Sequence, residues 1–135
     1  MLSFVTKYPF TMLTAAAIVV LSLAPISEVP QALDVPLADK WTHMLMYASL
    51  CIILWAEYWR CHRRESLMRH LCDNALRLTA LAFLCPIVLG STMELLQAFA
   101  TTYRSGEWLD MAANSIGVGI GTAVGICIGH FAKAR

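Results

Sequence analysis

Charged side chains are scarce in this sequence. Only 14% of its 135 residues are Asp, Glu, Lys or Arg, whereas 59% are hydrophobic and the mean hydropathy is +0.63. Soluble domains carry about 25% charged residues. A soluble bundle with so little charge would have too few polar side chains to cover its surface. The composition therefore favours a domain surrounded by hydrocarbon.

The sequence also lacks the common metal and redox motifs. No CxxC, HExxH or paired-histidine spacing occurs, and the five cysteines are expected to be buried or reduced thiols. We therefore expect no cofactor. No linker, low-complexity segment or internal repeat is visible, so residues 1–135 are predicted to form a single domain.

Four apolar runs make up most of the chain. They extend from Tyr8 to about Ile26, from Trp41 to about Trp59, from about Leu78 to Ala100, and from Met111 to His130. A helix needs about 20 residues to cross the hydrocarbon, and an isolated strand would leave its backbone groups unpaired there. The sequence therefore predicts an all-α polytopic membrane protein, a bundle of about four transmembrane helices. For the first run, a cleaved signal peptide is the alternative to a retained helix. Pro86 is expected to kink the third helix.

The basic residues predict the orientation of these helices. Eight of the ten Lys and Arg residues lie on one side of the bundle: Lys7, Arg60, Arg63, Arg64, Arg69, Arg77, Lys133 and Arg135. Cytoplasmic loops carry the excess of Lys and Arg, so both termini are predicted to be cytoplasmic. Because topology explains the basic loop, no nucleic-acid partner is expected.

Polar and ionisable residues gather at the opposite, extracytoplasmic boundary. They open the second run, end the third and open the fourth, and residues three or four apart share a helix face. Ionisable groups at membrane depth usually face the bundle interior or a wet cavity. We therefore expect one polar site that comprises Asp39, Lys40, His43, Tyr47, Glu94, Gln97, Arg104, Asp110 and Asn114.

One hypothesis makes this site act on or bind an envelope lipid or a lipid-linked headgroup. Lys40 and Arg104 would hold a phosphate or an anionic sugar. The candidate catalytic residues are His43, Glu94 and Asp110, which could serve as general acid and base. Asp39, Lys40, Tyr47, Gln97, Arg104 and Asn114 are the candidate substrate-binding residues.

A second hypothesis is a non-catalytic membrane protein whose polar residues hold the bundle together. Asp39 and Asp110 would then cap helices, and Gln97 and Asn114 would bond between helices. The sequence does not decide between an enzyme and such a scaffold. A metal site of His43, Glu94 and Asp110 is a third reading, which no ligand motif supports.

Small residues form a stripe along the fourth run. Ala113, Gly117, Gly121 and Gly125 follow one another at a spacing of four. Such stripes let helices approach closely in membranes. We therefore expect this face to pack against another helix.

The order of the polar residues resembles the VanZ-like family of small integral membrane proteins. The matching pieces span residues 39 to 121: Asp39-Lys40-x-x-His43-x-x-x-Tyr47, Glu94-x-x-Gln97, Arg104, and Asp110-x-x-x-Asn114-x-x-Gly117. The stretch before Arg104 lacks the proline that the resemblance leads one to expect. The resemblance implies a multi-pass protein of the bacterial inner (cytoplasmic) membrane with a role in the cell envelope. The founding members are linked to resistance to the glycopeptide antibiotic teicoplanin. The expected partner is a membrane lipid or a lipid-linked envelope precursor, and a homo-oligomer stays open.

Overall fold

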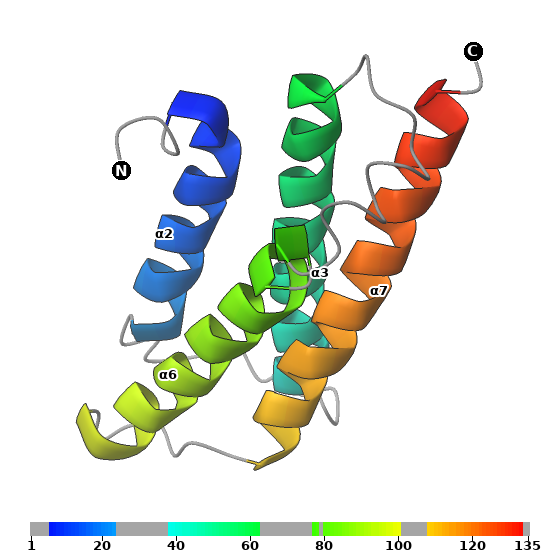
Figure 1. Ribbon diagram of the computed structural model, residues 1–135. Coiled ribbons are helices and arrows are strands. Elements are labelled where there is room, and N and C mark those ends of the chain that lie inside the picture. Colours follow the sequence, from blue (N-terminus) through cyan, green and yellow to red (C-terminus); the bar gives the residue numbers. More distant parts are fainter. Residues whose placement is uncertain (1–5, 24–37, 63–76, 79, 101–107, 134–135) are drawn as a thin grey trace.

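The computed structural model describes residues 6–23, 38–62, 77–78, 80–100 and 108–133. This part of the chain is all-α, as predicted (Figure 1). Helix α2 spans Pro9–Leu23, α3 spans Ala38–Cys61, α6 spans Cys85–Ala100 and α7 spans Trp108–Lys133. A π-helical segment, η2 (Ala80–Leu84), leads into α6. The four helices coincide with the four apolar runs.

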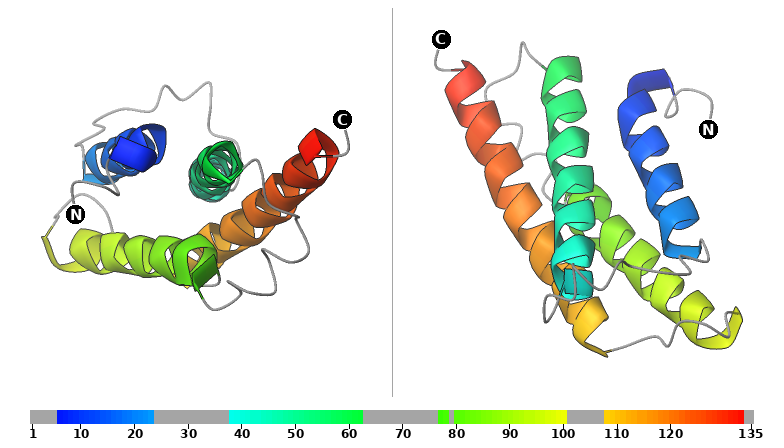
Figure 2. Two further views of the ribbon diagram at one scale, coloured as in Figure 1. Left: turned by 45° about the horizontal axis from the view of Figure 1, so that its top comes forward. Right: turned by 180° about the vertical axis from the view of Figure 1, so that it is seen from behind.

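The four helices alternate in direction. The start of α2 and the ends of α3 and α7 lie at one end of the bundle, while α3 and α7 begin at the other end, where α2 and α6 finish (Figure 1). Helix α3 is central, with α7 along one side and α2 along the other, and α6 crosses the bundle at a steep tilt (Figure 2). The alternation agrees with the prediction that the first helix starts, and the fourth helix ends, on the same side of the bundle.

Two helical stretches in the described part of the chain are long and apolar enough to cross a membrane. They are Ala80–Phe99 and Trp108–Phe131. Helix α2 has 15 residues. At about 1.5 Å per residue it is shorter than the hydrocarbon is thick. Helix α3 has 24 residues but contains charged groups near both ends, including Asp39 and Arg60.

The described part of the bundle buries several polar side chains within an apolar core and exposes many large apolar side chains. Phe99 and Trp108 are 85% and 86% exposed, and large apolar residues of all four helices also face outward. Soluble monomers rarely expose such extensive apolar surface. Among the described residues, the buried polar ones are Thr11, Ser22, His43, Glu57, Glu94, Gln97, Asp110, Asn114 and Thr122.

Helices α3 and α7 touch along the predicted stripe of small residues. A Cβ atom at Gly117 would collide with the backbone of Met44, and one at Gly121 with the backbone of Ala48. One turn and two turns further, Gly125 and Gly129 face the rings of Trp55 and Trp59. The indole Nε1 of Trp59 donates a hydrogen bond to the carbonyl of Gly125 at 3.0 Å. The stripe thus lets α7 lie directly on α3.

Helix α2 is held at both ends by side chains of its neighbours. The backbone N–H groups of Phe10 and Thr11 donate to the Glu57 carboxylate at 3.1 and 2.9 Å, and the Thr11 hydroxyl does so at 2.7 Å. At the other end, Gln97 Nε2 donates to the Ser22 carbonyl at 2.8 Å. A helix leaves its terminal N–H and C=O groups without intrahelical partners. Side chains from α3 and α6 therefore satisfy groups that the short helix cannot satisfy itself.

A π-helical segment precedes Pro86, the residue at which a kink is predicted. Proline has no N–H to donate to the carbonyl four residues earlier, which here belongs to Ala82. The chain is π-helical over Ala80–Leu84. The Ala82 carbonyl instead accepts the Thr122 hydroxyl at 3.5 Å and the Cys51 thiol at 3.8 Å. The freed carbonyl thereby connects the entry of α6 to α3 and α7.

Gly121→Ala is expected to destabilise the protein, whereas Gly119→Ala is not. A Cβ at Gly121 would lie 2.8 Å from Cys51 Cβ and 2.9 Å from Ala48 Cα, but one at Gly119 would meet no atom within 4 Å. Overpacking of this kind costs about 1–3 kcal/mol. Thermal unfolding of the two purified variants measures the difference. Equal midpoints would contradict the close packing of α3 on α7.

Candidate functional site

Six of the predicted site residues meet where α3 and α7 begin. We call them the polar cluster: Asp39, Lys40 and His43 of α3, Glu94 of α6, and Asp110 and Asn114 of α7. The imidazole of His43 is at the centre and is 2% exposed. Glu94, Asp110 and Asn114 are also buried. The periodicity of α3 explains the convergence, because Asp39 and His43 are one turn apart on the face that meets α6 and α7.

The inner side of His43 contacts α6 and α7. Its Nδ1 lies 3.2 Å from Asn114 Oδ1 and 3.6 Å from Glu94 Oε1. Asn114 Nδ2 in turn donates to Glu94 Oε1 at 3.4 Å. A proton on Nδ1 lets this nitrogen donate to Asn114 Oδ1, and in the neutral ring it leaves Nε2 as the acceptor. The three side chains form a closed set of contacts between three helices.

The outer side of His43 faces the more accessible edge of the cluster. Its Nε2 lies 3.9 Å from Asp39 Oδ1, and the Asp39 side chain is 50% exposed. Beside it, Lys40 Nζ lies 3.5 Å from Asp110 Oδ1. The two ring nitrogens of His43 therefore have different surroundings. Nδ1 contacts buried groups, whereas Nε2 faces the half-exposed Asp39.

The polar cluster carries more acidic than basic groups. It holds the carboxyls of Asp39, Glu94 and Asp110 against one ammonium, that of Lys40, and the imidazole of His43. Buried charges are tolerated only when they are paired or hydrogen-bonded. With all three carboxyls ionised, the cluster favours a further positive charge, on the imidazole or on a bound group.

Tyr47 and Gly90 form the floor beneath these residues. Tyr47 is 1% exposed and lies one turn beyond His43 in α3. A Cβ on Gly90 would come within 3.3 Å of the Tyr47 ring and 3.1 Å of Asn114 Nδ2. Among the described residues, the Tyr47 hydroxyl has no hydrogen-bond partner. Gly90, which was not among the predicted site residues, is thus the position where α6 makes room for both side chains.

The other two predicted site residues are placed differently. The Gln97 amide donates to the Ser22 carbonyl, so at least this donor serves the end of α2 and not the polar cluster. Arg104 lies outside the described residues. The described geometry of the site therefore rests on the six residues of the polar cluster and on Tyr47 beneath them.

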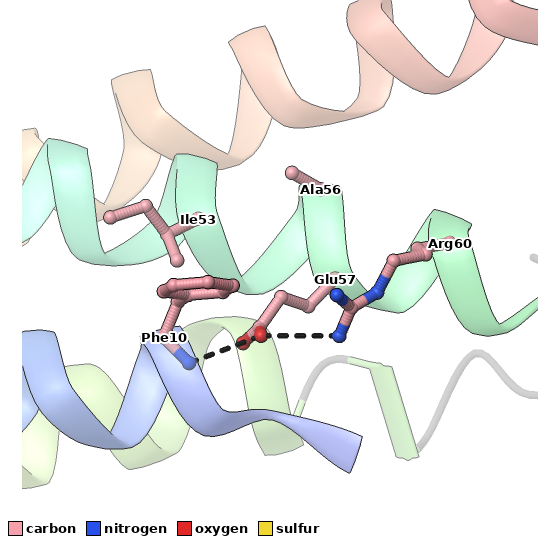
Figure 3. A pocket seen from close by; sticks show the side chains of 5 residues that line it. All are labelled: Phe10, Ile53, Ala56, Glu57 and Arg60. Atoms are coloured by element: carbon pink, nitrogen blue, oxygen red, sulfur yellow. Dashed lines mark hydrogen bonds and ion pairs between the residues drawn. The ribbon is translucent and has the colours of Figure 1, made fainter.

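A hollow of about 350 Å³ lies at the other end of α3 (Figure 3). It is lined by Phe10, Ile53, Ala56, Glu57 and Arg60. The Glu57 carboxylate is held between the first turn of α2 and the Arg60 guanidinium, which is 3.4 Å away. Glu57 is 14 residues beyond His43 in one helix, which corresponds to about 21 Å. Since its polar groups bond to each other, the hollow presents mainly carbon, and we assign the site chemistry to the polar cluster.

Asn114→Ala is expected to destabilise the protein by about 1–3 kcal/mol, because His43 and Glu94 then lose a buried partner. Ser115→Ala is the matched control. Ser115 is exposed and its hydroxyl bonds only within α7, to the Met111 carbonyl at 2.9 Å. The control should stay within about 0.5 kcal/mol of the wild type. Chemical unfolding of both variants tests this, and an equal effect of the two would mean that the cluster does not join the helices.

Comparisons with known proteins do not assign a family. No protein-family model, curated protein or solved structure matches the chain. The resemblance to the VanZ-like family stays a prediction from the order of the polar residues. The role of the polar cluster is accordingly argued from its own geometry.

Proposed function

We propose that this chain is a multi-pass protein of the bacterial inner membrane that binds an envelope lipid, or a lipid-linked precursor, by its headgroup. The polar cluster would receive the headgroup at the extracytoplasmic face. The observation that carries the proposal is the environment of His43, a buried imidazole with one nitrogen fixed by Glu94 and Asn114 and the other directed to the accessible edge.

Membrane insertion is supported by the distribution of side chains. Apolar residues cover the outside, polar residues are buried, and two helices are long enough to span the hydrocarbon. In water the exposed apolar surface would destabilise the folded protein, whereas in a bilayer it contacts hydrocarbon. Arg60 of α3 lies at the end of the bundle where α2 starts and α7 finishes. This end is therefore assigned to the cytoplasm, and the polar cluster to the opposite face.

Headgroup binding is supported by the position of Lys40. Its ammonium lies at the edge of the cluster, close to the Asp110 carboxylate and partly exposed. Lysine at a helix start can exchange such a partner for a phosphate at the membrane surface. Arg104 would supply a second cation from the loop that the sequence predicts between the third and fourth helices. A phosphate or anionic sugar is the headgroup chemistry that these two residues fit.

Acid–base chemistry at the headgroup is supported by the two-sided environment of His43. A carboxylate on Nδ1 holds the ring in one tautomer and stabilises the imidazolium that forms when Nε2 accepts a proton. In His43 the hydrogen-bond partner of Nδ1 is Asn114 Oδ1 at 3.2 Å, and the Glu94 carboxylate, 3.6 Å from Nδ1, would stabilise the imidazolium by its charge. Nε2 would then take the proton of a hydroxyl or water whose oxygen forms a bond to the headgroup phosphorus, and would return it to the oxygen whose bond to that phosphorus breaks. Asp110 and Asn114 would orient the group.

Membership of the VanZ-like family, with a link to teicoplanin resistance, is part of the same proposal. Its support is the ordered set of residues from Asp39 to Gly117 on three helices. Seven members of that set lie near one another at one end of the bundle. Members of the family would then share this site.

A non-catalytic scaffold is the second candidate, and one observation favours it. His43, Glu94 and Asn114 contact each other and thereby connect α3, α6 and α7. A cluster built only to hold helices together needs the same contacts.

Susceptibility to teicoplanin and to envelope stress in cells that express the protein separates these candidates. His43→Gln and Glu94→Gln should abolish any effect of the wild type while the protein still reaches the membrane at normal level, because each removes an acid–base group at similar volume. Ser115→Ala serves as the control on the exposed side of α7. If both variants lose the effect only because they disappear from the membrane, the scaffold is correct. A wild type without any effect would remove the link to resistance.

A further inference from the structure

The accessible side of the polar cluster has the composition of a metal site. One ligand atom from each of Asp39, His43 and Asp110 lies within 4.8 Å of the other two. Imidazole and carboxylate are zinc ligands, with bonds of about 2.0–2.2 Å, so donor atoms around a tetrahedral ion are about 3.4 Å apart. Side-chain rotations that move each donor by about 1 Å would bring the three onto a common ion. They come from the first two turns of α3 and the first turn of α7.

The surroundings of His43 Nδ1 independently favour metal binding through the other ring nitrogen, Nε2. A histidine that binds metal through one nitrogen almost always donates its other N–H to a carboxylate or carbonyl oxygen. His43 Nδ1 faces two such acceptors, Asn114 Oδ1 at 3.2 Å and Glu94 Oε1 at 3.6 Å. This arrangement leaves Nε2 as the donor atom toward Asp39 and Asp110. It also excludes Glu94 from the ligand set, although the sequence had suggested His43, Glu94 and Asp110.

Asp110 supplies the third observation. It is 3% exposed, and among the described residues its Oδ1 has no closely aligned hydrogen-bond donor apart from its ion-pair partner Lys40. The nearest positive charge is the Lys40 ammonium, 3.5 Å away. Because a buried carboxylate needs a cation, this oxygen can take either Lys40 or a metal ion. The Lys40 side chain is 22% exposed and can extend toward the surface when an ion replaces it.

We propose that Asp39, His43 and Asp110 bind a divalent transition-metal ion of the zinc class, and that Lys40 competes with it for Asp110. Glu94 and Asn114 act as positioning residues that fix the ring of His43. Three protein ligands leave a fourth position open, which a water or a phosphate oxygen can occupy. The metal site does not require the proposed headgroup function, since a scaffold could bind the same ion.

Cobalt(II) is the probe, because it replaces zinc in such sites and absorbs visible light according to its ligands. The full chain is purified in detergent, with Cys61, Cys72, Cys85 and Cys127 replaced by alanine so that the buried Cys51 is the one thiol that remains. We expect about one Co²⁺ per chain, displaced by Zn²⁺. His43→Gln should abolish the absorption, and Asp39→Asn should weaken binding about tenfold or more. Lys40→Met should tighten binding several-fold, because it removes the competing cation.

Two controls keep the outcome decisive. Glu57→Gln alters a buried carboxylate at the other end of α3 and should bind Co²⁺ like the wild type. Asp39 is half exposed, so Asp39→Asn should keep the fold even if His43→Gln does not, and thermal unfolding checks this. The proposal is overturned if neither wild type nor Lys40→Met binds Co²⁺, or if folded Asp39→Asn binds it as tightly as the wild type. The titration contains no lipid substrate. Failure to bind Co²⁺ would therefore leave the proposed headgroup binding intact, and failure of headgroup binding would leave the metal site intact.

Discussion

The contact of His43 with Glu94 and Asn114 is the interaction on which the rest of this structure depends. It joins α3, α6 and α7 at one end of the bundle, where all three side chains are buried. In the bilayer that we propose for this protein, lipid tails are as apolar as leucine, so apolar surfaces alone would give little drive for helix association. Polar contacts between helices and close packing of small residues would then hold the bundle. This protein combines the two, with the histidine at one end of α3 and the glycine stripe of α7 along its length.

Helix α3 organises the molecule because it carries a polar anchor near each end. His43 collects α6 and α7 at one end, and Glu57 binds the first turn of α2 at the other. Between them lie Tyr47, Cys51 and Trp55, which pack against α6 and the glycines of α7. The two anchors have different consequences. The Glu57 carboxylate is occupied by backbone N–H groups, whereas the His43 cluster keeps an accessible side.

The helices, and much of the polar cluster, could be predicted from the sequence. Four apolar runs determine four helices, and the spacing of Asp39, His43 and Asp110 relative to the helix starts places them at one level. The spacing of Gly117, Gly121 and Gly125 identified the face of α7 that meets another helix, although not which helix. These features depend on residues close in sequence, where helical periodicity is a reliable guide.

The contacts between helices could not be predicted in the same way. Glu57 of α3 binds the start of α2, and Gln97 of α6 binds its end. These contacts depend on which helices are neighbours, and an isolated polar residue in an apolar run does not reveal its partner. The same limit applies to His43. Periodicity placed it with Asp39, and its depth in the bundle suggested Glu94, but neither could assign a ring nitrogen to each carboxylate. The sequence also did not predict the π-helical form of the chain before Pro86, where Cys51 and Thr122 of other helices bond the freed carbonyl.

The most direct test of the account is whether the outside of the bundle lies in hydrocarbon. Ile120 lies near the middle of α7 and is 46% exposed. In a chain without other cysteines, Ile120→Cys would be treated with a water-soluble maleimide in intact membranes, and compared with a chain that retains only Cys61, which is exposed at the end of α3. We predict that Cys61 reacts and that the cysteine at position 120 reacts only after denaturation. Equal reaction at both positions in the membrane would mean that α7 is bathed in water and would contradict the account.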